Sequence, residues 1–166
     1  MARFDEFKQA NEQYAAQFDG GDLPIPPARN VAVVTCMDAR LHPEKFLGLE
    51  LGDAHVIRNA GGRVSDDAIR SLVISERLLG TDEIVVIHHT ECGMTTFRNE
   101  DLAAKIKEDL GVDVSGQDFL PFSDLEEGVR KDVAKVRASE LIPNDITVTG
   151  AIYDVKTGEL REVVRG

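Results

Sequence analysis

Residues 33–43 read VVTCMDARLHP, an apolar run that ends in a cysteine, an aspartate and an arginine at alternate positions. The segment VAVVT (31–35) is typical of a short strand that is buried on both faces of a sheet. Cys36, Asp38 and Arg40 would project to the same side if this strand continued. Because the chain has only 2 cysteines, the end of this strand is the first place to look for chemistry.

Further apolar runs predict more strands, with helices between them. AHVIRNA (54–60) and EIVVIHH (83–89) are predicted to be buried strands. Between them, residues 66–80 favour a helix that Ser65 or Asp66 can cap and that stops at its last residue, a glycine. Residues 42–49 and 97–110 are predicted as helices, and 123–138 as a helix opened by a capping box of Ser123 and Glu126. Residues 146–155 are predicted as a strand, and 156–164 as a hairpin turn that leads into a last edge strand.

Strands that alternate with helices predict an α/β fold. We expect a mostly parallel central sheet of about four strands, an antiparallel edge strand, and helices on both faces. Ligands of such sheets bind beyond the carboxyl ends of the strands. The three strand ends CMDAR, RNAGG and HHTEC therefore share one edge of the predicted sheet.

The N-terminal residues predict an arm outside this sheet. Residues 4–18 favour an amphipathic helix, and a Gly/Pro-rich connector follows them. The aromatic residues of its apolar face are Phe4, Phe7, Tyr14 and Phe18. We divide the chain into a helical arm with its connector (1–27) and a single α/β domain (28–166). The helix packs either on a partner subunit or on its own core.

Composition excludes several functional classes. The net charge of −11 and the scattered basic residues argue against nucleic-acid binding, because phosphate neutralisation needs a basic patch. No apolar run approaches the ~18 residues of a membrane span. The first ten residues, MARFDEFKQA, lack the apolar core of a signal peptide. We therefore predict a cytoplasmic protein that acts on a small molecule.

A metal site is predicted at the shared edge. His89 and Cys92 have H-x-x-C spacing, and Cys36 supplies a second sulfur from the first strand. Two thiolates and an imidazole are donors that zinc prefers, and Asp38 can add a fourth oxygen or leave that position to water. Taken singly, these residues are ordinary strand-end or turn residues, but both cysteines of the chain meet at one edge. His42, His55 and His88 are assigned to core or surface.

The same residues also suit two functions besides a catalytic zinc site. Cys36 and Arg40 could form a nucleophilic cysteine site, although Asp38 between them would repel an anion and raise the thiol pKa. A zinc-binding scaffold without catalysis is the second alternative, but it would not need both Asp38 and Arg40 beside the metal.

The motifs C-x-D-x-R (36–40), R-N-A-G (58–61) and H-x-x-C-G (89–93) resemble the signature of the β-class carbonic anhydrases, in order and spacing. The short length, CMDAR and HHTECGM are most similar to the small actinobacterial-type members. The resemblance implies Zn²⁺ on Cys36, His89 and Cys92. It also implies an Asp38–Arg40 dyad, in which Asp38 either ligates zinc or pairs with Arg40.

The activity that the resemblance implies is reversible hydration of CO2 to bicarbonate and a proton by zinc-bound hydroxide. Relatives with this signature also hydrolyse carbonyl sulfide or carbon disulfide, so these substrates remain the alternative. Gly61 and Gly62 are expected to line the substrate pocket, Arg58 to be structural, and His42 is a candidate proton shuttle. The family further implies a homodimer or homotetramer in which the N-terminal helix contacts the neighbouring subunit.

Overall fold

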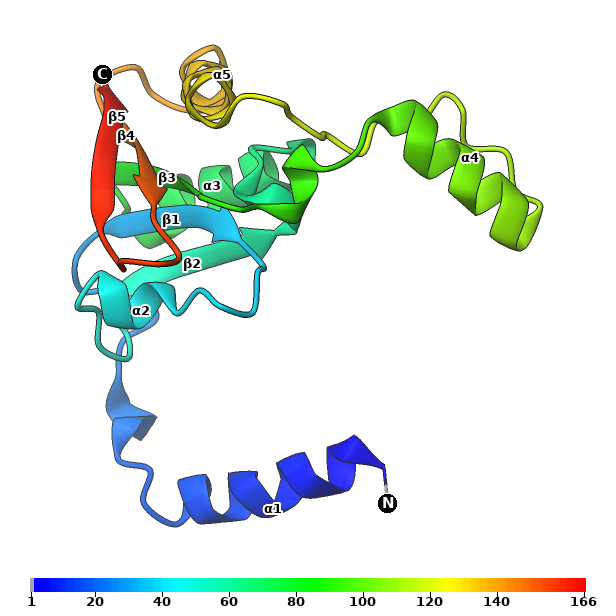
Figure 1. Ribbon diagram of the computed structural model, residues 1–166. Coiled ribbons are helices and arrows are strands. Elements are labelled where there is room, and N and C mark those ends of the chain that lie inside the picture. Colours follow the sequence, from blue (N-terminus) through cyan, green and yellow to red (C-terminus); the bar gives the residue numbers. More distant parts are fainter. Residues whose placement is uncertain (1) are drawn as a thin grey trace.

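The computed structural model describes residues 2–166 and has a five-stranded sheet at its centre (Figure 1). The strands are β1 (Val31–Cys36), β2 (Ala54–Asn59), β3 (Glu83–His89), β4 (Thr147–Tyr153) and β5 (Leu160–Arg165). In the order β2-β1-β3-β4-β5, neighbouring strands are parallel except for β5, which runs antiparallel to β4. The predicted mostly parallel sheet with an antiparallel edge strand is confirmed.

Helices cover the two faces of this sheet unequally. The helices of the described residues are α1 (Arg3–Ala15), α2 (Pro43–Phe46), α3 (Asp66–Leu79), α4 (Asn99–Leu110) and α5 (Leu125–Arg137), and the 3₁₀ turns are η1 (Gly20–Asp22), η2 (Ala60–Gly62) and η3 (Gly93–Thr95). α3 and α5 pack on one face, whereas the short α2 lies on the other. None of these helices combines the length and the apolar character needed to cross a membrane.

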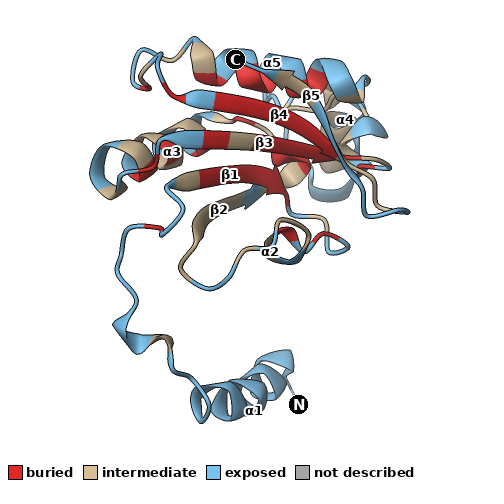
Figure 2. Cartoon of the chain, turned by 90° about the vertical axis from the view of Figure 1, so that its left-hand side faces the viewer, coloured by how far each residue is buried: buried red, intermediate tan, exposed pale blue. Residues whose placement is uncertain are grey.

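The apolar runs form strands because both of their faces are covered. In β1, Ala32 and Val34 face the core under α3 and α5, while Val33 faces the α2 side. Phe46 of α2 packs on that second cluster and stacks on Tyr153 with ring centroids 4.2 Å apart. Figure 2 shows the result as buried stretches along β1, β3 and β4. This burial on both faces fixes the register that brings the strand ends together.

The ends of α3 agree with the sequence, whereas α1 and α2 end three residues earlier than predicted, at Ala15 and Phe46, and α4 begins two residues later, at Asn99. The Ser65 hydroxyl accepts a hydrogen bond from the Ala68 N–H, and Gly80 ends α3 with a left-handed backbone. The predicted Ser123 cap of α5 is wrong by one residue, because Asp124 accepts the Glu127 N–H at 2.8 Å. Serine and aspartate are equally good caps, so their order in the sequence could not distinguish them.

The N-terminal helix extends away from the sheet (Figures 1 and 2), and none of its residues is buried. Met1, the first residue of the predicted arm, lies outside the described residues. The exposed aromatic residues are Phe4, Phe7, Tyr14 and Phe18, at 68%, 63%, 58% and 46% of their surface. Of the two expected arrangements, packing on its own core is therefore not the one observed.

Candidate metal centre

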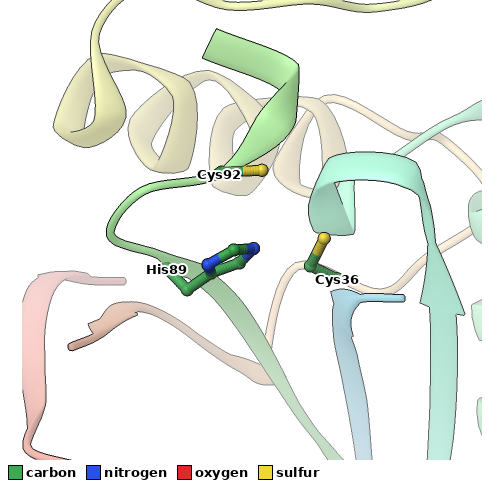
Figure 3. A group of neighbouring side chains, drawn as sticks. All are labelled: Cys36, His89 and Cys92. Carbon is green, nitrogen blue, oxygen red and sulfur yellow. The ribbon is translucent and has the colours of Figure 1, made fainter. Parts of the chain in front are cut away.

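The ends of β1 and β3 bring together the three residues with sulfur and imidazole donors. β1 ends at Cys36 and β3 at His89, and these neighbouring strands pair in parallel. The donor atoms of Cys36, His89 and Cys92 all lie within 4.8 Å of one another, and the three residues are buried. Figure 3 shows the two sulfurs and the imidazole turned toward a common point. We call these three residues the donor cluster.

Two hydrogen bonds of Thr90 hold the turn between His89 and Cys92 against the end of β4. The Thr90 N–H donates to the Tyr153 carbonyl at 3.0 Å, and the Thr90 hydroxyl accepts the Val155 N–H at 3.0 Å. The sulfur of Cys92 is thereby turned back toward the end of β1.

The His89 ring is oriented for metal binding. Its Nδ1 lies 2.8 Å from the Thr90 carbonyl, which can only accept, so Nδ1 carries the proton. Nε2 consequently presents a lone pair, and this buried atom has no hydrogen-bond partner in the described residues. An unsatisfied buried polar atom costs about 1–3 kcal/mol, and a metal ion would remove that cost. The donor set thus fits a metal ion.

The two cysteine side chains affect each other's ionisation. Cys92 donates to the Cys36 sulfur, which lowers the pKa of Cys36 and raises that of Cys92. The backbone N–H groups of Asp38 and Gly61 also point at the Cys36 sulfur and lower its pKa further. Because the thiolate is the metal-binding form of cysteine, this environment favours that form at Cys36.

Asp38 lies beside the donor cluster and is held by Arg40. The guanidinium donates from Nε to Oδ1 at 3.0 Å and from Nη2 to Oδ2 at 2.7 Å. These bonds hold the pKa of Asp38 well below its usual range, so the carboxyl group is ionised. Oδ2 is also 3.7 Å from the His89 Nε2. Of the two expected positions of Asp38, the structure has the one paired with Arg40.

Arg58 fixes the backbone that follows β1. Its Nε donates to the Cys36 carbonyl at 2.9 Å and its Nη2 to the Asp38 carbonyl at 2.7 Å. Arg58 therefore contacts the loop and not the donor atoms, in agreement with the structural role expected for it.

Gly61 and Gly62 allow η2 to pack against the ends of β1 and β3. Both have left-handed backbones, with φ of 83° and 63°. A Cβ on Gly62 would lie 2.8 Å from the Cys36 backbone nitrogen and 3.0 Å from the Ile87 carbonyl oxygen. A Cβ on Gly61 would lie 2.9 Å from Cγ of Met94. Their predicted place in a substrate pocket remains a prediction.

Gly62→Ala is expected to lower the free energy of unfolding by about 1–3 kcal/mol through backbone strain, and further through the contacts with backbone atoms. Urea unfolding followed by circular dichroism measures the change. Gly116→Ala is the matched control, because no atom lies within 4 Å of the added carbon and the backbone is not left-handed. Equal stability of the two variants would contradict the close approach at Gly62.

The sequence profile of a family described as carbonic anhydrase matches residues 31–111, which include the whole donor cluster. Beta-carbonic anhydrase 1 of Mycobacterium tuberculosis is 43% identical over 163 residues, covering 98% of this chain and 99% of that protein. The chain belongs to the β-carbonic anhydrase family. The resemblance found in the motifs is thereby confirmed.

Two further proteins are similar to this β-carbonic anhydrase family member over most of its length. The crystal structure of the carbonic anhydrase of Streptococcus mutans matches it with a TM-score of 0.96 at 58% identity, covering 99% of both chains. A carbon disulfide hydrolase of Acidithiobacillus thiooxidans is 38% identical over 159 residues, covering 84% of this chain and 79% of that protein. The relatives are thus named for two reactions.

A buried cluster of ion pairs next to the donor cluster was not predicted from the sequence. Asp132 of α5 accepts from the Arg63 Nε at 2.8 Å and lies 2.9 Å from the His88 Nε2. Burial alone would raise the pKa of Asp132, but the bonds from His88 and Arg63 lower it overall. The sequence could have indicated this cluster, because Asp132 lies on the same face of α5 as the buried Val129 and Val136.

The remaining histidines lie outside the donor cluster. His88 is fully buried, as the assignment to core requires. The His55 Nδ1 is 2.7 Å from the Ser75 hydroxyl. His42 is exposed, with its Nε2 3.9 Å from Glu44, and its role as a proton shuttle remains a prediction.

Proposed function

We propose that this protein catalyses the zinc-dependent, reversible hydration of CO2 to bicarbonate and a proton. In this proposal Cys36, His89 and Cys92 bind the zinc ion, and Asp38 and Arg40 are catalytic. The observation that carries it is the buried donor cluster, in which one imidazole nitrogen and two sulfurs lie within 4.8 Å of one another. The Nε2 of His89 has no partner in the described residues, and a carboxylate held by Arg40 lies beside it.

The donor set supports zinc over other ions. Thiolate and imidazole are soft and borderline ligands, which suit zinc better than magnesium or calcium. When bound, zinc supplies a Lewis acid that lowers the pKa of a coordinated water molecule. Two thiolates cancel the +2 charge of the ion, so this effect is weaker than with three neutral histidines, and neighbouring residues have to help.

Asp38 and Arg40 supply that help. The ionised Asp38 can only accept hydrogen bonds, so it orients a water or hydroxide proton near the donor cluster. Its bidentate bonds to Arg40 keep it from becoming a fourth anionic ligand. Gly61 and Gly62, whose backbone packs against the Cys36 loop, are proposed to line the space where the substrate enters.

Hydrolysis of carbon disulfide or carbonyl sulfide is the second candidate. The carbon disulfide hydrolase relative, at 38% identity, favours this alternative, because it spans most of the present chain. The linear triatomic substrates are alike in shape, so the same donor cluster and the same Asp38–Arg40 pair serve either reaction. Access to the site then decides the substrate.

Side-by-side assays test the two candidates. For the zinc-loaded protein we expect rapid CO2 hydration in a stopped-flow pH assay and little release of hydrogen sulfide from carbon disulfide or carbonyl sulfide. Sulfide release without CO2 hydration would assign the second function. Inactivity toward all three substrates would support a non-catalytic zinc protein.

We also propose that the protein assembles as a homodimer or homotetramer through its N-terminal arm. The exposed aromatic face of α1 supports this, because its own chain leaves that face uncovered.

A further inference from the structure

Glu91 has an unusual backbone conformation inside the turn that joins His89 and Cys92. In residues 2–166, Glu91 is one of three non-glycine residues with positive φ, here 54°, together with Asn30 and Leu120. A glutamate gains nothing locally from this conformation, which glycine adopts without strain. Its side chain is therefore the feature to explain.

The Glu91 carboxylate connects two basic residues from different parts of the fold. Oε1 lies 2.9 Å from the Lys156 Nζ, and Oε2 lies 3.6 Å from the Arg40 Nη1. The Glu91 carbonyl also accepts from the Arg40 Nη2 at 3.0 Å. The backbone of Lys156 is held in the β4–β5 turn, because its N–H donates to the Asp154 carboxylate.

The guanidinium of Arg40 divides its nitrogens between two carboxylates. Nε and Nη2 bond to Asp38, which leaves Nη1 to face Glu91. The Glu91 carboxylate is thus placed to restrain the rotation of the guanidinium without taking a donor from Asp38. The restraint matters because the Arg40 side chain is 48% exposed and would otherwise exchange its partners for water.

We infer that Glu91, tethered by Lys156, is a positioning residue that keeps Arg40 in the orientation that holds Asp38 away from the donor cluster. Without this restraint, Asp38 is freer to move toward the His89 Nε2, which is only 3.7 Å from its Oδ2. The kinetic consequence rests on the proposed function, whereas the orientation of Arg40 does not.

The test uses zinc-loaded Glu91→Gln and Lys156→Ala and measures kcat/KM for CO2 together with exchange of the Arg40 Nε–H proton with water by NMR. Because exposed ion pairs contribute little free energy, we expect about a two- to fivefold loss of kcat/KM and a similar acceleration of proton exchange in each variant. Lys156→Arg should restore both values, and the double variant should be no worse than Glu91→Gln alone. Lys105→Ala, which removes an equally short pair with Asp109 on α4, is the matched control.

A further variant separates positioning from folding. Glu91→Gly removes the carboxylate and relieves the backbone strain, so its unfolding temperature should not fall while the Arg40 proton exchanges faster. Unchanged exchange and kcat/KM in Glu91→Gln would overturn the inference, and additive losses in the double variant would remove Lys156 from it. If the wild-type protein hydrated no CO2, the proposed function would fail, but the exchange rates would still decide the role of Glu91.

Discussion

His89→Ala and Cys92→Ser are each expected to abolish zinc retention and to lower kcat/KM for CO2 hydration by more than about 100-fold. That value is the upper range for residues that only support a metal ligand, and loss of a ligand itself removes more. Alanine deletes the unpaired Nε2 of His89. Serine replaces a thiolate with a hydroxyl group that stays protonated near neutral pH. Both changes leave too few donors for a stable zinc site.

Metal analysis after dialysis and stopped-flow hydration assays measure these two losses. His42→Ala is the matched control for His89→Ala, because His42 is an exposed histidine outside the donor cluster, and it should keep its zinc. A His89→Ala protein with a full zinc content would refute the proposed ligand set. Zinc-free Cys92→Ser with normal activity would instead favour a nucleophilic Cys36.

Asp38→Asn and Arg40→Ala are expected to keep zinc and to lose hydration activity by about 100-fold or more, the scale of a lost acid–base group. Asparagine is neutral and presents an amide donor, so it no longer orients a proton as the ionised Asp38 does. Arg40→Ala removes both bonds that hold Asp38, and the freed carboxylate can then move toward the donor cluster. A double variant that loses no more activity than either single variant would identify the pair as one unit.

Zinc content and stopped-flow rates, measured on the same samples, separate this effect from metal loss. The Asp67–Arg70 pair on α3 provides the control, since it is a similarly close ion pair at 2.8 Å on an exposed surface. Asp67→Asn and Arg70→Ala should change neither quantity. Near-normal hydration by Asp38→Asn or Arg40→Ala would exclude the proposed dyad.

The sheet and the donor cluster could be predicted from the sequence for one physical reason. The runs that form β1 and β3 are apolar on both faces, and parallel pairing of such strands places their carboxyl ends side by side. Cys36 and His89, which end these two strands, are therefore expected to lie close together. The spacing of His89 and Cys92 then left the second sulfur within reach.

The contacts that the sequence left undetermined depend on side chains from distant segments. Nothing local links Asp132 to Arg63, because only the packing of α5 on the sheet brings them together. The same holds for Glu91 and Lys156, which meet because the Thr90 backbone is bonded to the end of β4. The amphipathic pattern of residues 4–18 likewise predicted a helix but not the surface that covers it.

The location of the donor cluster would couple the proposed metal binding to folding. Cys36 and Cys92 belong to segments that are distant in the sequence and adjacent only when β1 pairs with β3. The unfolded chain offers no equivalent site, so each tenfold increase of free zinc above the dissociation constant adds about 1.4 kcal/mol to the native state. In the proposed zinc enzyme, the supply of free zinc would therefore set both the fraction of the protein that is active and the fraction that stays folded.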